Sequence, residues 1–263
     1  MSGDGDIKIR LVDVCKRFGD KQVLDHVSLD IAARRNAVLV GSAASGKSVL
    51  LKCLVGLHRP ESGRVEIDGV DTVHLKRGER IRMMLRFGVL FQRSALFDSL
   101  PVWENIAFKL IQAERMPRPK AREHALEKLG QVGLSADVAD LMPASLSGGM
   151  QKRVGLARAI AGDPEFLILD DPTAGLDPIN TRNINRLINK CVDELGATAL
   201  SVTGDMASAR EEYDDLTMIH EGRVIWSGPT ADIDRSDDPY LQQLINGRAK
   251  GPIKMRVRAR GPS

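Results

Sequence analysis

Gly41-Ser-Ala-Ala-Ser-Gly-Lys-Ser48 is the stretch of sequence that decides the fold. It fits the pattern G-x-x-x-x-G-K-[ST] and stands between a short apolar run, Ala37-Val-Leu-Val40, and a helical pattern that continues to Leu57. Glycines let such a loop turn tightly, so that its N–H groups at the start of a helix face phosphate oxygens. In this pattern Lys47 reaches the β- and γ-phosphates of a nucleotide, and Ser48 holds Mg²⁺. The stretch therefore predicts a strand, a phosphate-binding loop and a helix.

A second apolar run, Phe166-Leu-Ile-Leu169, predicts a buried strand that ends at Asp170. Such a strand would deliver the carboxylate to the edge of a sheet, where it can hold the water shell of Mg²⁺. Many buried strands end in aspartate, so this signal is weak by itself. Beside the phosphate loop it is strong, and the two stretches together predict a site for ATP and Mg²⁺.

Leu146-Ser-Gly-Gly-Met-Gln151 lies between these two stretches. It opens a predicted helix whose residues Met150, Val154, Ala157 and Ile160 share one face. A pair of glycines at the start of a helix is a second place where an anion can bind. An ordinary loop with a helix N-cap explains the same residues when they are seen in isolation.

The rest of the chain alternates between strand and helix patterns. Strands are predicted at 7–14, 23–31, 63–69 and 197–203, and amphipathic helices at 101–113 and 118–132. Strands that return after a helical insert predict an α/β fold, with a parallel core sheet and a helical subdomain set into it.

The composition is that of an ordinary globular protein, with 43% hydrophobic and 28% charged residues among 263. No apolar run approaches the roughly 18 residues needed to cross a bilayer. The first six residues also lack the order of a signal peptide, so we expect the chain to stay in the cytoplasm. Cys15, Cys53 and Cys191 predict buried, reduced thiols. The five histidines lack metal-ligand spacing, and no metal centre built from side chains alone is expected.

The net charge of +3 is unevenly distributed. Residues 246–263 carry six basic side chains and no acidic one, whereas the rest of the chain has 32 basic and 35 acidic residues. Such a tail can contact anionic lipid or an acidic partner surface, or it can be a solvated end.

In this order and spacing, the phosphate loop, the Leu146–Gln151 stretch and the Asp170 strand resemble the ABC ATPase family over nearly the whole chain. The resemblance implies a P-loop NTPase (RecA-like) core with an N-terminal antiparallel β subdomain and an inserted α-helical subdomain. It places the core at 1–93 and 162–230, the helical subdomain with the signature motif at 94–161, and a C-terminal extension at 231–263. In this family two subunits pair head to tail, and the signature of one covers the ATP of the other. A homodimer is therefore expected.

Residue roles follow from the resemblance. Phe18 looks like the aromatic side chain that stacks on adenine, with core packing as the alternative. Gln92 looks like the glutamine that senses Mg²⁺ and the membrane partner, and 174–177 like the loop that communicates across the dimer. The expected catalytic residues are Lys47, Gln92 and Asp171, and the expected Mg²⁺ ligands, partly through water, are Ser48, Gln92 and Asp170. The residues expected to bind ATP are Phe18, Gly41, Ser42, Ala43, Ala44, Ser45, Gly46, Lys47, Ser48, Val49, Ser147, Gly148 and Gly149.

Three positions depart from the family pattern. Ala44 stands where a further glycine is usual, Asp171 where a glutamate orients or activates the attacking water, and Gly204 where a histidine contacts the γ-phosphate. Aspartate is one methylene shorter than glutamate, so its carboxylate retreats by about 1.5 Å. A misplacement near 1 Å can cost on the order of 100-fold in rate. We expect ATP binding and ATP hydrolysis, with Asp171 and Gly204 lowering the rate.

Several stretches are similar to one branch of this family, the ATPases of bacterial Mla/Mce-type lipid transporters. They are 88–97 with 102–105, 146–154 with Met150 where glutamine is usual, 171–179, and the ending at 238–240, 246–249 and 251–253. The similarity implies a peripheral location on the cytoplasmic face of the bacterial inner membrane, under a transmembrane permease subunit. An Mce-domain substrate-binding protein would join through the permease, an accessory subunit would be a further partner, and no nucleic acid is involved. The cargo would be phospholipids or other hydrophobic molecules.

Other functions fit the same residues. The ATPase of a transporter for a polar solute would differ only in its permease. A nucleotide-binding regulatory subunit would hardly hydrolyse ATP, which Asp171 and Gly204 allow. Non-transport ABC proteins generally carry two ATPase domains in one chain, whereas this sequence has one phosphate loop and one signature. The lipid and the direction of transport are not specified by these residues.

Overall fold

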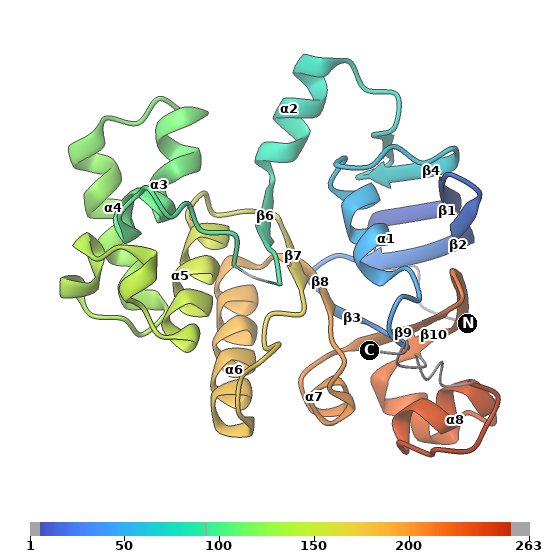
Figure 1. The fold of residues 1–263 in the computed structure, drawn as a ribbon. Helices are drawn as coiled ribbons and strands as arrows, with labels where there is room; N and C mark the ends of the chain where they lie inside the picture. Colours follow the sequence, from blue (N-terminus) through green and yellow to red (C-terminus); the bar gives the residue numbers. More distant parts are fainter. Residues whose placement is uncertain (1–5, 93, 254–263) are drawn as a thin grey trace, which may run out of the picture.

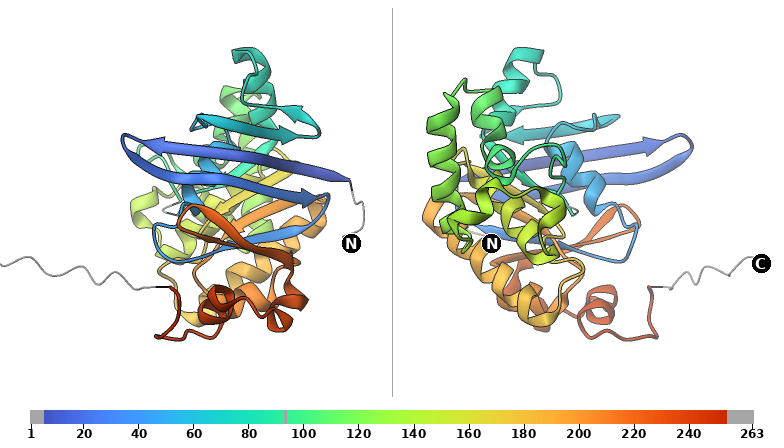
Figure 2. Two further views of the ribbon diagram at one scale, coloured as in Figure 1. Left: turned by 90° about the vertical axis from the view of Figure 1, so that its right-hand side faces the viewer. Right: turned by 60° about the vertical axis from the view of Figure 1, so that its left-hand side comes forward.

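The computed structural model describes residues 6–92 and 94–253, which form two β-sheets and a block of helices (Figures 1 and 2). One sheet is antiparallel and has the strand order β2-β1-β4-β5. The larger sheet has the order β10-β9-β3-β8-β7-β6 and is parallel except for β10. The strands are β1 (Ile7–Phe18), β2 (Lys21–Ala32), β3 (Asn36–Val40), β4 (Ser62–Ile67), β5 (Val70–Asp71), β6 (Phe87–Leu90), β7 (Phe166–Asp170), β8 (Thr198–Val202), β9 (Asp215–His220) and β10 (Arg223–Pro229).

The helices lie around these sheets (Figure 1). α1 lies between the two sheets, the block of α3, α4 and α5 lies at one side of the larger sheet, and α8 lies near the C-terminal end of the chain. The α-helices are α1 (Lys47–Leu54), α2 (Arg77–Leu85), α3 (Val102–Gln112), α4 (Arg118–Gln131), α5 (Gly148–Ile160), α6 (Pro178–Leu195), α7 (Met206–Glu211) and α8 (Pro239–Ile245). Short 3-10 helices cover Ala136–Asp140, Pro143–Ser145 and Thr230–Arg235.

The middle of the larger sheet is buried on both faces. All five residues of β3 and all five of β8 are buried, as expected for parallel strands covered by helices on both sides. β8 lies between β3 and β7, and Val202 on β8 is in register with Leu39 on β3 and with Asp170 on β7. The carboxyl ends of these strands therefore meet at one edge of the sheet, where the predicted phosphate loop begins.

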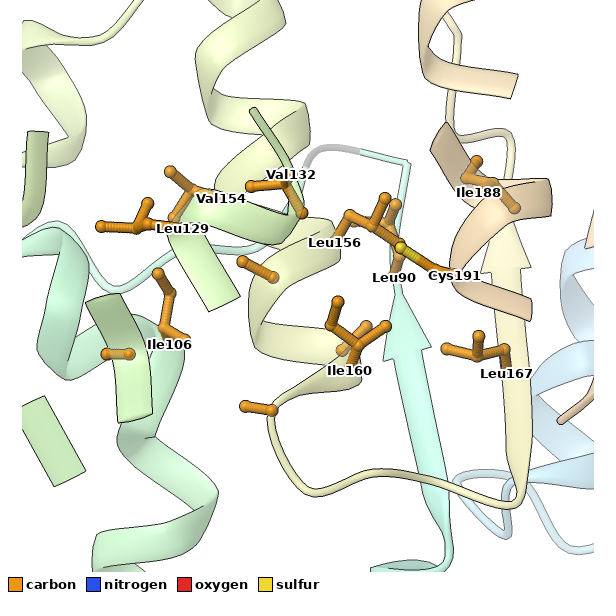
Figure 3. Close-up of a cluster of buried hydrophobic side chains, with 14 of the residues drawn as sticks. Leu90, Ile106, Leu129, Val132, Val154, Leu156, Ile160, Leu167, Ile188 and Cys191 are labelled. Carbon is orange, nitrogen blue, oxygen red and sulfur yellow. The ribbon is translucent and has the colours of Figure 1, made fainter. Parts of the chain in front are cut away.

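The helical block is joined to the sheet by one hydrophobic cluster (Figure 3). Ile106 on α3, Leu129 on α4 and Val154 on α5 form its outer part, and each has no exposed surface. Leu156 and Ile160 extend the cluster to the sheet and α6, where it ends at residues such as Leu167 and Cys191. The apolar face predicted for α5 is therefore the contact between the block and the sheet.

Two further clusters cover the remaining faces. The first packs α1 between the antiparallel sheet and one face of the larger sheet. The second packs α7, α8 and Ile253 on β3 and β9. Gln243 on α8, which is 5% exposed, holds the chain end: its Oε1 accepts the Ile253 N–H at 2.7 Å. Most of the predicted basic tail, residues 254–263, lies outside the described residues.

Some element boundaries differ from the expectation. The first two strands are longer than predicted, and α1 ends at Leu54 rather than Leu57. The chain turns at Gly56, which has φ 71°, and the N–H groups of Leu57 and His58 both bind the Lys52 carbonyl. Within the described ranges, no helix combines the length and the apolar character that a membrane span requires.

Candidate nucleotide site

The phosphate loop connects β3 to α1 in a conformation that only glycine allows at two points. Gly41 has φ 148°, and a Cβ there would lie 2.0 Å from the Ile219 carbonyl oxygen. Gly46 has φ 108°, and a Cβ there would lie 2.8 Å from the Val23 carbonyl oxygen. The loop is therefore pressed against β9 on one side and β2 on the other. Between these glycines, Ala44 adopts a left-handed conformation with φ 60°, which costs an alanine about 1–2 kcal/mol.

The Lys47 ammonium lies over its own loop. Its Nζ donates to the carbonyl oxygens of Gly41 and Ser42, both at 2.8 Å, and to Ser45 Oγ at 3.2 Å. Burial lowers the pKa of Lys47, and the neighbouring Asp171 and Asp170 carboxylates act in the opposite direction. The ammonium of Lys47 therefore lies beside the main chain of the loop, and its contact with the phosphates stays a prediction.

Ser48 and Asp170 form the oxygen pair that the sequence predicts for Mg²⁺. Ser48 Oγ donates to Asp170 Oδ1 at 2.9 Å, which brings together residues from α1 and the end of β7. A hydroxyl and a carboxylate are hard oxygen donors that suit Mg²⁺, so these two residues fit the ion and would hold it. Val49, which follows, packs its side chain against the hydrophobic cluster around α1.

Asp171 and Gln92 meet beside this pair. Gln92 Nε2 donates to Asp171 Oδ2 at 3.4 Å, although Gln92 follows β6 and Asp171 follows β7. Asp171 has φ 51°, a left-handed conformation that aspartate tolerates better than most residues. Burial raises the pKa of Asp171 and Asp170 adds to this, while Lys152, Lys47 and Gln92 lower it. Asp171, which stands at the position of the usual glutamate, is therefore in contact with Gln92 and close to Lys47 and Asp170.

Gly204 leaves an open space next to Asp171. A Cβ at Gly204 would meet no atom within 4 Å. The residue borders a pocket of about 490 Å³ that Asp171, Thr203 and Asp205 also line. Asp205 already caps α7, because its carboxylate accepts the Ala207 N–H at 3.0 Å and the Ser208 hydroxyl at 2.6 Å. It is therefore not free to replace the missing histidine in this conformation.

The signature residues lie in a different pocket. Ser147 is the N-cap of α5 and its Oγ accepts the Met150 N–H at 3.3 Å. Ser147, Gly148 and Gly149 line a pocket of about 400 Å³ together with Gly175 and Asp177 of the 174–177 loop, and no phosphate-loop residue lines it. One chain thus brings Lys47, Ser48, Gln92, Asp170 and Asp171 together and leaves the signature apart from them.

Phe18 is 45% exposed, which disagrees with core packing as its role. Its ring lies edge-on to His58 with the centroids 5.2 Å apart, and Lys16 Nζ lies 5.3 Å from the ring centroid. An exposed ring at the end of β1 is available for stacking. The adenine contact stays a prediction, as do the other individual site roles.

Lys152 is a residue of this site that the sequence reasoning missed. It lies on α5, five residues after Ser147, and only 7% of it is exposed. Its Nζ donates to the Gln92 carbonyl oxygen, and burial lowers its pKa against the opposing effect of Asp171 and Asp170. Its place in the signature stretch was the available signal, but a lysine in a helix is usually expected at the surface.

Outside this site, Cys15, Asp25 and His26 each place one ligand atom within 4.8 Å of the others. Arg223 Nη2 lies 2.5 Å from the Asp25 carboxylate, and Cys15 Sγ accepts the His26 N–H at 3.3 Å. These groups are already engaged in contacts that join β1, β2 and β10. The expectation that side chains alone form no metal centre stays a prediction.

Residues 24–174, which include the phosphate loop, the signature and the Asp170 strand, match the family model described as "ABC transporter". This chain belongs to the ABC transporter family. It is an ABC ATPase, which binds ATP with Mg²⁺ and hydrolyses it. The predicted fold class, a P-loop core with an antiparallel β subdomain and a helical subdomain, is confirmed.

Several relatives are similar to this ABC ATPase over most of its length. The "Probable ribonucleotide transport ATP-binding protein mkl" of Mycobacterium leprae is 39% identical over 97% of this chain and 74% of its own. The "Protein TRIGALACTOSYLDIACYLGLYCEROL 3, chloroplastic" of Arabidopsis thaliana is 37% identical over 97% and 78%. The "Intermembrane phospholipid transport system ATP-binding protein MlaF" of Haemophilus influenzae is 34% identical over 95% of both chains.

Among solved structures, the ATP-binding cassette MJ0796, dimeric and bound to ADP and Pi after hydrolysis, is similar with a TM-score of 0.78 and 31% identity. The similarity covers 84% of this chain and 98% of that one. The shared part is thus nearly the whole of that cassette, and the remainder of this chain is additional to it.

Proposed function

We propose that this ABC ATPase energises a Mla/Mce-type transporter of phospholipids or other hydrophobic molecules. The observation that carries the proposal is the similarity to MlaF, which covers 95% of both chains. The signature also has Met150, which resembles the Mla/Mce pattern, where most ABC ATPases have glutamine. In this function the subunit lies on the cytoplasmic face of the bacterial inner membrane, under a permease that binds an Mce-domain protein and, as a further partner, an accessory subunit.

The separation of the two pockets supports a homodimer. Lys47 and Asp170 form one half of an ATP site, and Ser147 lines a pocket to which no phosphate-loop residue contributes. A helix N-terminus that carries partial positive charge is suited to a phosphate, but in one chain it has none to bind. A head-to-tail partner would place the signature of each subunit over the ATP of the other.

The relatives are named for the transport of different molecules. MlaF is named for phospholipid transport, mkl for ribonucleotide transport and MetN of Mesorhizobium japonicum, at 34% identity, for methionine import. A transporter for a polar solute is therefore the main alternative. The ATPase fold is common to all of them, so the membrane partners decide between these functions.

Purification of the chain from solubilised membranes of its own host tests the proposal. We expect a permease and an Mce-domain protein to co-purify. The complex in proteoliposomes should transfer a fluorescent phospholipid in an ATP-dependent manner, and the complex made with Lys47→Ala should not. A permease without an Mce-domain partner, or transfer that is equal with and without ATP, contradicts the lipid proposal.

A nucleotide-binding subunit with very slow turnover is a second candidate, favoured by Asp171 and the empty space at Gly204. The purified complex distinguishes the two functions. Steady-state ATPase activity that increases in the presence of lipid supports the transporter, and very slow ATPase activity that lipid does not increase supports the regulatory subunit.

A further inference from the structure

The loop that carries Gln92 is strained and must be held by its surroundings. After Gln92, Ser94 has φ 57° and Ala95 has φ 47°, so two successive described residues with side chains are left-handed. Each such residue costs about 1–2 kcal/mol relative to an ordinary conformation. Strain of this kind persists only where neighbouring groups fix the backbone, and it gathers at functional sites.

Helix α5 supplies the groups that fix this loop. Arg158 donates from Nη2 to the Ser94 carbonyl oxygen at 2.5 Å and from Nη1 to the Ala95 carbonyl oxygen at 2.8 Å. The helix also approaches the loop closely at Gly155, where a Cβ would lie 2.7 Å from Leu90 Cδ1 and 3.1 Å from Ser94 Cβ. The left-handed part of the loop is thus bound to α5 rather than to the larger sheet.

Lys152 holds the same loop at Gln92 itself. Its ammonium donates to the Gln92 carbonyl oxygen, and the Gln92 side chain then reaches Asp171 Oδ2 at 3.4 Å. Lys152 is 7% exposed and forms no ion pair among the described residues, although the charges of Asp171 and Asp170 act on it from a greater distance. A lysine buried without a close ion pair is costly and uncommon, so packing alone does not account for it.

We propose that Lys152 is a positioning residue for ATP hydrolysis. Its ammonium fixes the main chain of Gln92 to α5, so that the Gln92 side chain stays beside Asp171. The signature Ser147 is the N-cap of the same helix. A movement of the signature is therefore transmitted to Gln92 of its own subunit through Lys152. The proposal concerns the hydrolysis step and does not depend on the cargo of the transporter.

Substitution of Lys152 by methionine tests the ammonium apart from the packing. Methionine fills a similar space, and replacement of a buried charge by an apolar side chain need not destabilise a fold. We expect Lys152→Met to lower kcat about tenfold, because Gln92 is no longer fixed. The KM for ATP should change less than about twofold, because the phosphate loop is untouched, and Lys152→Arg, which keeps the charge and donors, should recover most of kcat.

Lys128 on α4 provides a matched control, since it is 5% exposed and donates at 2.6 Å to Asp163, which follows α5, rather than to the loop. Lys128→Met should keep kcat. A second arm measures Lys152→Met in a Gln92→Ala background, where we expect less than about a twofold further loss because Lys152 acts through Gln92.

Thermal unfolding establishes that each variant is folded. If Lys152→Met does not fold, Lys152→Gln is measured in its place. Non-additive losses, together with an unchanged KM and recovery by arginine, support the proposal. An unaltered kcat in Lys152→Met overturns it. So does the same tenfold loss in the Gln92→Ala background, or an equal loss in Lys128→Met.

Discussion

The phosphate loop and the ends of β7 and β8 meet at one edge of the larger sheet, where we predict the ATP site, but they are built in different ways. The loop is shaped by the main chain: Gly41 and Gly46 have no room for a side chain, and Lys47 binds three acceptors of the loop itself. At the strand ends the site depends on side chains, and Gly204 and Asp171 both border a pocket of about 490 Å³. The main chain of the phosphate loop is therefore tightly constrained, whereas a side chain at position 204 would meet open space.

The largest expected effect comes from Lys47→Ala, which removes the cation of the phosphate loop. Turnover should fall by more than about 100-fold, because the main charge on the β- and γ-phosphates is lost. Equilibrium binding of a fluorescent ATP analogue and steady-state ATPase activity measure the loss. Lys52→Ala on the same helix is the control, and unchanged affinity and turnover in Lys47→Ala would show that the site is assigned wrongly.

Ser147→Arg tests whether the signature of a second subunit completes the ATP site. The bulky cation stands where a helix N-terminus would meet the partner's γ-phosphate. We expect ATP binding by the single subunit to survive, while ATP-driven dimerisation and turnover fall about 100-fold. Size-exclusion chromatography with ATP and turnover of the assembled complex report on this, with Ser135→Arg on the helical block as the control. Normal turnover would contradict a head-to-tail dimer.

Asp171→Glu and Gly204→His change the residues that follow β7 and β8. If Asp171 is a recessed form of the usual glutamate, the longer carboxylate should raise turnover about tenfold, and the histidine should add to it. The structure favours this outcome, because the position of a Cβ at Gly204 is free and Asp205 is engaged as the cap of α7. The two gains need not be additive, since both groups act on the same γ-phosphate.

Steady-state ATPase activity of the purified complex, for the wild type, both single variants and the double variant, decides this point. Glutamate tolerates the left-handed backbone at position 171 less well than aspartate, so a small decrease in the unfolding temperature should accompany Asp171→Glu. No increase in turnover in any of the three variants would reject the recessed carboxylate and leave a site that is repacked around Asp171.

Ala44→Gly should have the smallest effect, and on stability rather than on rate. Glycine relieves the left-handed conformation at φ 60° but makes the unfolded chain more flexible. The net gain in the free energy of unfolding should be about 0.5–1 kcal/mol. Thermal unfolding without nucleotide measures it, and Ala43→Gly in the same loop is the control. A loss of stability in Ala44→Gly would mean that the strain at this position is not relieved.

The sequence predicted those parts of the fold in which local pattern and tertiary role agree. The apolar run at 37–40, the phosphate loop and the apolar face of α5 all lie as expected, because burial on both faces or on one stripe is visible in the residues themselves. The helix α2 was not predicted. None of its residues is buried, and its apolar residues Ile81 and Met84 are exposed, so this short helix is not marked by burial in a core, on which the other predictions relied.

Site residues that act through long-range contacts were harder to predict. Lys152 contacts Gln92, 60 positions away in the chain, and only the packing of α5 on the loop makes this contact visible. The left-handed conformation of Ala44 is likewise set by the tight glycines around it and not by alanine. The resemblance to the family identified Gln92 and Asp171, but the identity of a residue does not show which side chain holds it in place.

The position of β8 between β3 and β7 has a consequence for how such an enzyme can diversify. Neighbouring strands lie about 4.8 Å apart, so the strands that lead to Ser48 and Asp170 are held about 10 Å from one another by main-chain hydrogen bonds. This spacing is common to every sequence that preserves the sheet, whatever follows the strands. The turns after β7 and β8 can then change in sequence while the distance between the strands stays constant. Such changes would give subunits that bind the same nucleotide but hydrolyse it at different rates.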